Sequence, residues 1–140
     1  MTKKRKSFDE RLDDALRNIV SSGAQTDFEA ALRDLNRIVE SIKKRYFGQS
    51  AHILLNAEPG FTTNIGMQMK VVVRIPKFRY RDVLFHAYIP QGGYPVGLDL
   101  GTEAPLPCGN RSELEDHIFE FVVLPDVNAR MHQYRELAEQ

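Results

Sequence analysis

The spacing of apolar positions divides the chain into a helical first third, a strand-rich middle and a helical end. Apolar residues recur every three or four positions over 8–21 and again over 26–47, which is typical of amphipathic helices. Gly48 supplies a stop signal after the second stretch. We therefore expect two N-terminal helices, the second opening with a Thr26–Glu29 capping box.

The period changes to two after Gly48, which is typical of β-strands. The stretch 56–66 is rich in Asn, Pro and Gly and indicates a connection between strands. Short links favour antiparallel neighbours, because parallel strands need long crossovers. The expected strands are 51–55, 67–75, 80–89 and 94–100, and in the third of them Val83, Phe85, Ala87 and Ile89 are expected on one face.

The last third is helical again. Asn110 or Ser112 is the expected cap, with Ser112–Glu115 as a second capping box, and Pro125 separates a further amphipathic helix. The predicted fold class is therefore α+β, with N-terminal helices, a four-stranded antiparallel meander and C-terminal helices.

The composition of the chain bears on which classes of molecule it binds and on the cellular compartment in which it works. The 140 residues carry a formal net charge of zero, which predicts no strong attraction to nucleic acid or to an anionic membrane. The basic cluster at residues 3–6 is then a solvated tail. The single cysteine excludes an intramolecular disulfide and favours a reducing compartment. With no secretory signal pattern and no long apolar run, the sequence predicts a cytoplasmic protein.

The second N-terminal helix carries a continuous apolar seam, formed by Phe28, Leu32, Leu35, Val39, Ile42 and Tyr46. Packing in the core of the domain is the commoner use of such a seam. Contact with a protein partner, or with a second copy through the N-terminal helices, is the alternative. Leu35, Val39 and Ile42 are the candidate contact residues, together with Tyr94 and Pro95 of a later turn.

Cys108 is the candidate nucleophile, because it lies just before the expected start of a helix, whose dipole can lower the pKa of a thiol. A hydrolytic site would also need a base, and no local motif ties any of the four histidines to Cys108. A lone cysteine between strand and helix is more often a small buried hydrophobe. The sequence has no metal-ligand spacing and no nucleotide-binding loop, so we expect no metal and no cofactor.

Pro90 and the Tyr94–Pro95 step mark the turn after the third expected strand. Together with the order of the elements, they resemble the fold of the ubiquitin-conjugating enzymes and of their relatives, the catalytically inactive variants and the RWD domains. The resemblance extends over residues 26–140 and implies one domain there. Residues 1–25 are then a basic tail and an additional helix.

The resemblance implies different things about fold and activity. Active family members carry a His-Pro-Asn step before the cysteine, whereas this chain has Gly-Thr-Glu-Ala-Pro-Leu-Pro before Cys108, with Asn110 as the one substitute donor. We therefore predict a non-catalytic protein-binding module that acts as a subunit or adaptor in a protein-modification complex. The alternatives are a conjugating enzyme that accepts a ubiquitin-like protein from its activating enzyme as a thioester on Cys108, and an unrelated α+β chaperone or immunity-type interaction protein.

Overall fold

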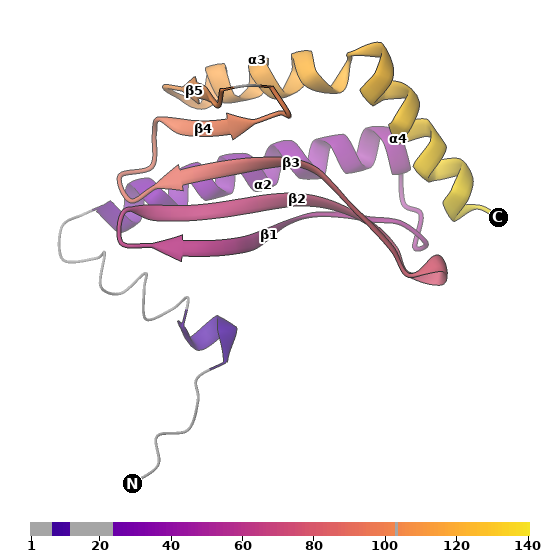
Figure 1. The fold of residues 1–140 in the computed structure, drawn as a ribbon, viewed down its shortest axis with the longest axis horizontal. Coiled ribbons are helices and arrows are strands. Elements are labelled where there is room, and N and C mark those ends of the chain that lie inside the picture. Colours follow the sequence, from indigo (N-terminus) through magenta and orange to yellow (C-terminus); the bar gives the residue numbers. More distant parts are fainter. Residues whose placement is uncertain (1–6, 12–23, 103) are drawn as a thin grey trace, which may run out of the picture.

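A five-stranded antiparallel sheet, preceded and followed by helices, makes up the described part of the chain (Figure 1). The structure is a computed structural model, and it describes residues 7–11, 24–102 and 104–140. The expected α+β class is confirmed. The elements are α2 (Ala24–Phe47), β1 (Leu54–Thr63), β2 (Gly66–Ile75), the short 3-10 helix η1 (Pro76–Phe78), β3 (Tyr80–Pro90), β4 (Val96–Asp99), β5 (Leu106–Cys108), α3 (Arg111–Val122) and α4 (Pro125–Ala138).

Helix α2 follows its predicted course at the C-terminal end but not at the start. Thr26 lies inside the helix rather than at its N-cap, so the predicted Thr26–Glu29 capping box is wrong. At the other end Gly48 takes the left-handed backbone conformation (φ 58°), and its N–H donates to the carbonyl of Lys44 at 3.1 Å. A glycine adopts this conformation without steric cost, which is why it ends the helix here.

The strand order follows the chain, β1-β2-β3-β4-β5, and all neighbours are antiparallel. The sheet is thus a meander of five strands, and the prediction of four strands is wrong. The additional strand, β5, pairs Val96 with Cys108 and Leu98 with Leu106. Its three residues include Pro107, which cannot donate a backbone hydrogen bond and is tolerated in this edge strand. So short a segment has no periodicity to recognise.

Strand β1 covers much of the stretch that we expected to be a connection. It pairs with β2 from Leu54 opposite Arg74 to Thr63 opposite Gly66. The register shifts between Pro59 and Thr62, which lets an edge strand accommodate a Pro-Gly step. The predicted strand 51–55 is therefore displaced toward the C-terminus.

A second irregularity, in the pairing of β2 with β3, changes which side chains share a face. Val71 lies opposite Phe85 but Val72 lies opposite Val83, so β3 has one extra residue at Leu84. A bulge of this kind reverses the alternation of side chains along the strand. Phe85, Ala87 and Ile89 share the buried face as predicted, whereas Val83 lies on the opposite one.

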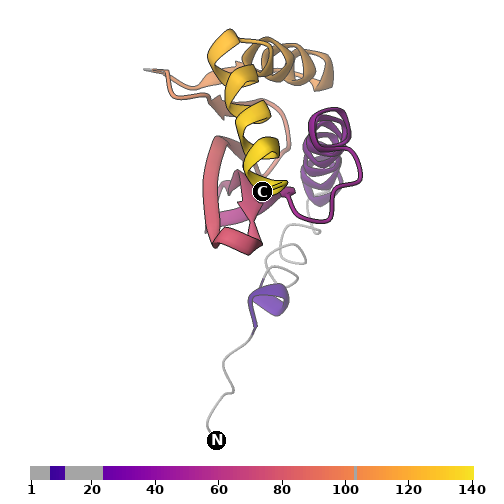
Figure 2. The ribbon, with the colours of Figure 1, turned by 90° about the vertical axis from the view of Figure 1, so that its right-hand side faces the viewer.

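The helices bury the inner face of the sheet (Figure 2). Helix α2 lies along this face, and α3 contributes Phe121, whose ring meets that of Phe85 edge-on at a centroid distance of 5.7 Å. Helix α4 is joined to β3 near the start of that strand by a hydrogen bond from the hydroxyl of Tyr134 to the carboxylate of Asp82. None of the described helices is both long enough and apolar enough to cross a membrane.

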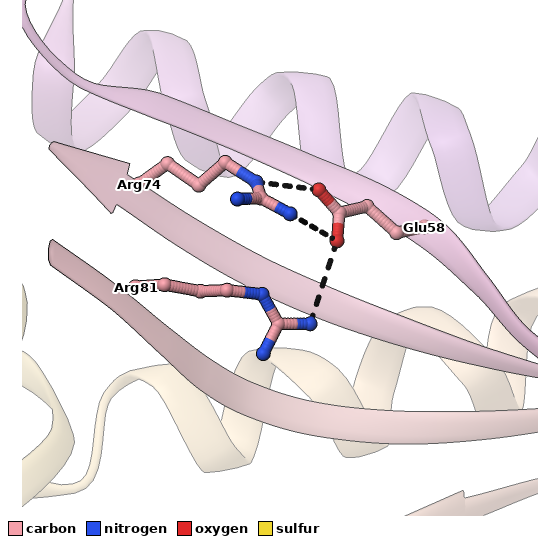
Figure 3. A network of polar contacts seen from close by, with 3 residues as sticks. All are labelled: Glu58, Arg74 and Arg81. Atoms are coloured by element: carbon pink, nitrogen blue, oxygen red, sulfur yellow. Dashed lines mark hydrogen bonds and ion pairs between the residues drawn. The ribbon is translucent and has the colours of Figure 1, made fainter. Parts of the chain in front are cut away.

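The outer face of the sheet carries a network of charged side chains from three strands (Figure 3). The Arg74 guanidinium donates to both carboxylate oxygens of Glu58, at 2.6 and 3.0 Å, and Arg81 reaches the same carboxylate at 3.6 Å. The hydrogen bond from Arg74 is the main reason that the pKa of Glu58 lies below its ordinary value. Charged groups on this face indicate that it is solvated.

The helix predicted over 8–21 and the basic tail before it lie mostly outside the described residues. Residues 8–11 are helical, and the N–H of Glu10 donates to the hydroxyl of Ser7 at 3.2 Å, which is the geometry of an N-cap. The ring of Phe8 is 50% exposed. The division of the chain at residue 25 stays a prediction.

Candidate functional site

The structure places Cys108 at the end of β5 and buries it completely, with 0% of its surface exposed. The thiol donates to the carbonyl of Leu106 at 3.8 Å. Burial, helped by the negative charge of Glu113, raises the pKa of the thiol to about 11. The thiol is therefore protonated at neutral pH, and protonated thiols are poor nucleophiles.

The start of α3 uses the groups that could otherwise have served Cys108. The side chain of Asn110 accepts a hydrogen bond from the N–H of Glu113 at 2.9 Å and so caps the helix. The Glu113 carboxylate in turn accepts from the N–H of Gly109. Of the two predicted caps, Asn110 and Ser112, the structure confirms Asn110. The carboxylate that completes the capping box belongs to Glu113. The predicted Ser112–Glu115 box is wrong, because Glu115 pairs instead with Arg111 at 3.4 Å.

No histidine is hydrogen-bonded to the cysteine within the described residues. The hydrogen bond of the Cys108 thiol goes to the backbone carbonyl of Leu106 and not to an imidazole. Residues 7–11, 24–102 and 104–140 also contain no group of three or more His, Cys, Asp or Glu side chains that could hold a metal ion. The region around Cys108 has the character of a packed join between sheet and helix.

The Tyr94 turn is tied to α2. The hydroxyl of Tyr94 donates to the carboxylate of Asp34 at 2.8 Å, and burial is the main reason that the pKa of this phenol is raised. Gly93 (φ 88°) approaches the helix so closely that a Cβ there would come within 2.5 Å of the Asp27 carbonyl oxygen. The Tyr94–Pro95 peptide bond is cis, and Pro95 is exposed. The turn holds α2 against the sheet, and Pro95 is its solvent-facing corner.

Leu35 and Val39, which we predicted as contact residues, are buried in the core of the chain. Neither side chain lies on the surface, so the seam is used first for packing α2 onto the sheet. Ile42, one helical turn further on, is only partly buried. It lines a groove that the periodicity of α2 does not predict.

This groove has a volume of about 770 Å³ and lies between α2, α3 and the first turns of α4. Ile38 and Ile42 of α2 and Ile118 and Val122 of α3 form its apolar floor. Tyr46, Asn128 and His132 also line the groove. The Tyr46 hydroxyl donates to the Asn128 side-chain oxygen at 2.7 Å, and the Tyr46 ring meets that of His132 edge-on at a centroid distance of 5.6 Å. We call it the α2–α3 groove.

The two rims of the α2–α3 groove differ in chemistry. The α2 rim consists of Arg37, Ser41 and Arg45 at helical spacing, and neither arginine forms an ion pair within the described residues. The α3 rim includes Phe119, 66% exposed, and Val123, 51% exposed. Large apolar side chains exposed along a polar rim are typical of a protein-contact surface.

The sequence contains one local signal for this groove, on α3. The buried side of α3 is formed by Leu114, Ile118, Phe121 and Val122. Phe119 does not belong to this set, and an apolar residue beyond the buried stripe of an amphipathic helix marks a second apolar face. The position of α2 beside that face depends on the tertiary fold.

Comparison with known proteins adds no identification. The chain matches no protein-family model, no curated protein and no solved structure.

Proposed function

We propose that this chain is a small protein-binding module with a ubiquitin-conjugating-enzyme-like fold, which performs no chemistry and acts as a subunit or adaptor in a protein-modification complex. The observation that carries the proposal is the α2–α3 groove, whose apolar floor is open and whose α2 rim presents Arg37 and Arg45 without partners among the described residues. Two helices that flank an apolar groove are a recurring way of binding an amphipathic helix of another protein.

The arrangement of elements supports the family resemblance. A helix precedes an antiparallel sheet whose strands follow one another in chain order, a Tyr-Pro turn leads into a short fourth strand, and two helices end the chain. The fifth strand, β5, occupies the position of the irregular segment that the family carries before its cysteine. The single cysteine supports a cytoplasmic location.

The state of Cys108 supports the non-catalytic half of the proposal. A conjugating enzyme must expose its thiol to a bulky protein C-terminus and attack as a thiolate. Here the thiol is buried and its pKa is raised to about 11. Asn110, the one substitute donor, is occupied as the cap of α3.

Site-specific photo-crosslinking in cells tests the binding function. A benzoylphenylalanine placed at Phe119, on the groove rim, should give a defined crosslinked protein band that mass spectrometry identifies. The matched control is the same probe at Glu120, the next residue, which is exposed on α3 but outside the groove. Equal crosslinking at the two positions, or none at Phe119, contradicts the proposal.

A thioester assay tests the absence of chemistry. The purified chain is incubated with a ubiquitin-like protein, its activating enzyme and ATP, and is run on a non-reducing gel. We expect no thiol-sensitive adduct. An adduct that forms on the wild-type chain and disappears in Cys108→Ala would overturn the proposal in favour of the conjugating enzyme.

A further inference from the structure

The shape and charge of the α2–α3 groove define what fits it. From Arg37 to Tyr46 the groove runs along ten residues of α2, a rise of about 14 Å at roughly 1.5 Å per residue, or two to three helical turns. Its occupant needs an apolar stripe for the floor and acidic side chains beside that stripe for Arg37 and Arg45. On the opposite rim the acid is Glu115, which pairs with Arg111 of its own helix through one carboxylate oxygen; its other oxygen favours a basic residue on the other flank of the stripe.

The chain itself contains a segment of this kind. Residues 8–21 carry an apolar stripe at helical spacing and four acids against two arginines, a net charge of −2. Asp9, Asp13 and Arg17 each follow a stripe residue, so at 100° per residue they lie along one flank of a helix, which carries two acids and one arginine. Arg11 precedes a stripe residue and lies along the other flank. This order of a net acidic flank, an apolar stripe and a flank that carries Arg11 matches the two rims and the floor of the groove.

Resting on the proposed binding function, we propose that the α2–α3 groove binds residues 8–21 of a second copy of this chain. The described start of that segment is consistent with a role in binding: its helical turn is capped by Ser7, and Phe8 is half-exposed. This turn lies well away from α3 in both views of the molecule (Figure 1, Figure 2).

Chain length disfavours binding of the segment to the groove of its own copy. Helix α2 begins at Ala24, only a few residues after the segment. A helix that turned back antiparallel to α2 would set residue 21 beside residue 26. Because both helices have the same rise per residue, Phe8, thirteen residues before residue 21, would then lie near residue 39, thirteen residues after residue 26. Residues 3–6, which are all Lys or Arg, would then lie near Arg45, where like charges repel. A segment from a second copy has no such constraint on its register.

Binding of residues 8–21 in the groove of a second copy can also be reciprocal. Each copy offers one groove and one segment, so a two-fold axis satisfies both contacts and closes the assembly as a dimer. The groove residues of one copy and the segment residues of the other then form each binding site.

A charge exchange measured by sedimentation equilibrium of the full chain tests this proposal. We expect the wild-type chain to dimerise reversibly. Arg37→Glu with Arg45→Glu, and separately Asp9→Lys with Asp13→Lys, should each weaken the dimer on the order of tenfold or more, because attraction becomes repulsion. Arg33→Glu with Lys44→Glu, exposed on α2 outside the groove, is the matched control and should leave the dimer unchanged.

Mixing the two charge variants distinguishes binding of the segment to a second copy from binding to the groove of its own copy. An equimolar mixture of the groove variant and the segment variant should restore the dimer, since each groove then meets a segment of opposite charge on the other chain. The chain that carries all four substitutions should dimerise as well. Circular dichroism of every variant verifies the fold.

Three results would overturn the inference: a wild-type chain that stays monomeric at all concentrations, a dimer that the groove variant does not weaken, or no recovery on mixing. A monomeric chain that still crosslinks through Phe119 to a different protein would leave the proposed function standing and assign the groove to an acidic helix of that partner.

Discussion

The two ends of α3 lie in opposite environments. At its N-terminal end Cys108 is buried, Asn110 and Glu113 satisfy backbone N–H groups, and the thiol has its own acceptor. Toward its C-terminal end the same helix exposes Phe119 and Val123 across a groove from Arg37 and Arg45 of α2. Satisfied polar groups and a protonated thiol are typical of a packed interior, whereas exposed apolar groups beside arginines without ion pairs among the described residues are typical of contact surfaces. Cys108, the candidate nucleophile, thus lies at the buried end.

The largest predicted difference between the two ends is in stability. Leu114→Ala removes a completely buried side chain and should lower the free energy of unfolding by about 2–5 kcal/mol. Phe119→Ala, on the groove rim, should change it by less than about 0.5 kcal/mol. Urea unfolding followed by circular dichroism, at low protein concentration so that association does not contribute, measures both. Similar losses in the two variants would show that the groove is part of the core.

The second prediction concerns the reactivity of Cys108. Because the thiol is buried and protonated, its alkylation by iodoacetamide in the native chain should be at least roughly a hundredfold slower than in urea at the same pH, since labelling requires local opening. Rates are measured by mass spectrometry. Native labelling as fast as that of the unfolded chain would contradict the closed environment of this end of α3.

The raised thiol pKa also predicts how stability depends on pH. The unfolded thiol loses its proton near its ordinary value of 9.0, before the folded one does at about 11. Its contribution is therefore complete below pH 9.0 and is lost as the pH rises through 9.0 to about 11. Thermal unfolding of wild type and Cys108→Ala over this range should show a steeper decline for wild type. Parallel curves would contradict the shift.

A smaller effect is expected at the cap of α3. Asn110→Ala should destabilise the chain by about 1 kcal/mol, because the N–H of Glu113 loses its acceptor. Asn110→Ser, which can still accept, is the matched control and should recover most of that loss. Chemical unfolding measures both variants. Equal losses would mean that the side chain has another role, such as the donor role expected in a conjugating enzyme.

The smallest effect on stability is expected for the charged network of Figure 3. This network is exposed to solvent, so its effect can be compared with those of substitutions at the two ends of α3. Glu58→Gln should cost less than about 1 kcal/mol at neutral pH, because exposed ion pairs contribute little. The pKa of Glu58 is lowered in the folded chain, so its contribution is present above the ordinary value of 4.5 and is lost as the pH falls through the folded value. The stabilities of the two proteins should converge in acid.

Periodicity predicted the course of α2, the long strands β2 and β3 and the two C-terminal helices, because long elements repeat their burial pattern several times. It failed where pairing overrides composition: β1 runs through Pro59 and Gly60, and β5 has only three residues. It also misplaced Val83, because a bulge reverses the alternation without leaving a trace in the sequence.

The candidate site was less predictable than the fold. Cys108 and Asn110 were identified from their residue types, but burial and capping, which decide their roles, depend on tertiary contacts. The α2–α3 groove combines residues about eighty positions apart in the chain. The apolar pattern within one helix does not indicate which distant helix packs beside it. Phe119 alone gave a local signal, as an apolar residue outside the buried stripe of its helix.

The most direct test of the claim that the chain binds through the groove and not through its cysteine is the yield of the photo-crosslink at position 119 in two further backgrounds. We predict that the crosslinked band persists in Cys108→Ala and is strongly reduced in Arg37→Glu with Arg45→Glu, while circular dichroism shows both variants to be folded. The reverse result, a band that depends on Cys108 and ignores the two arginines, would contradict the claim.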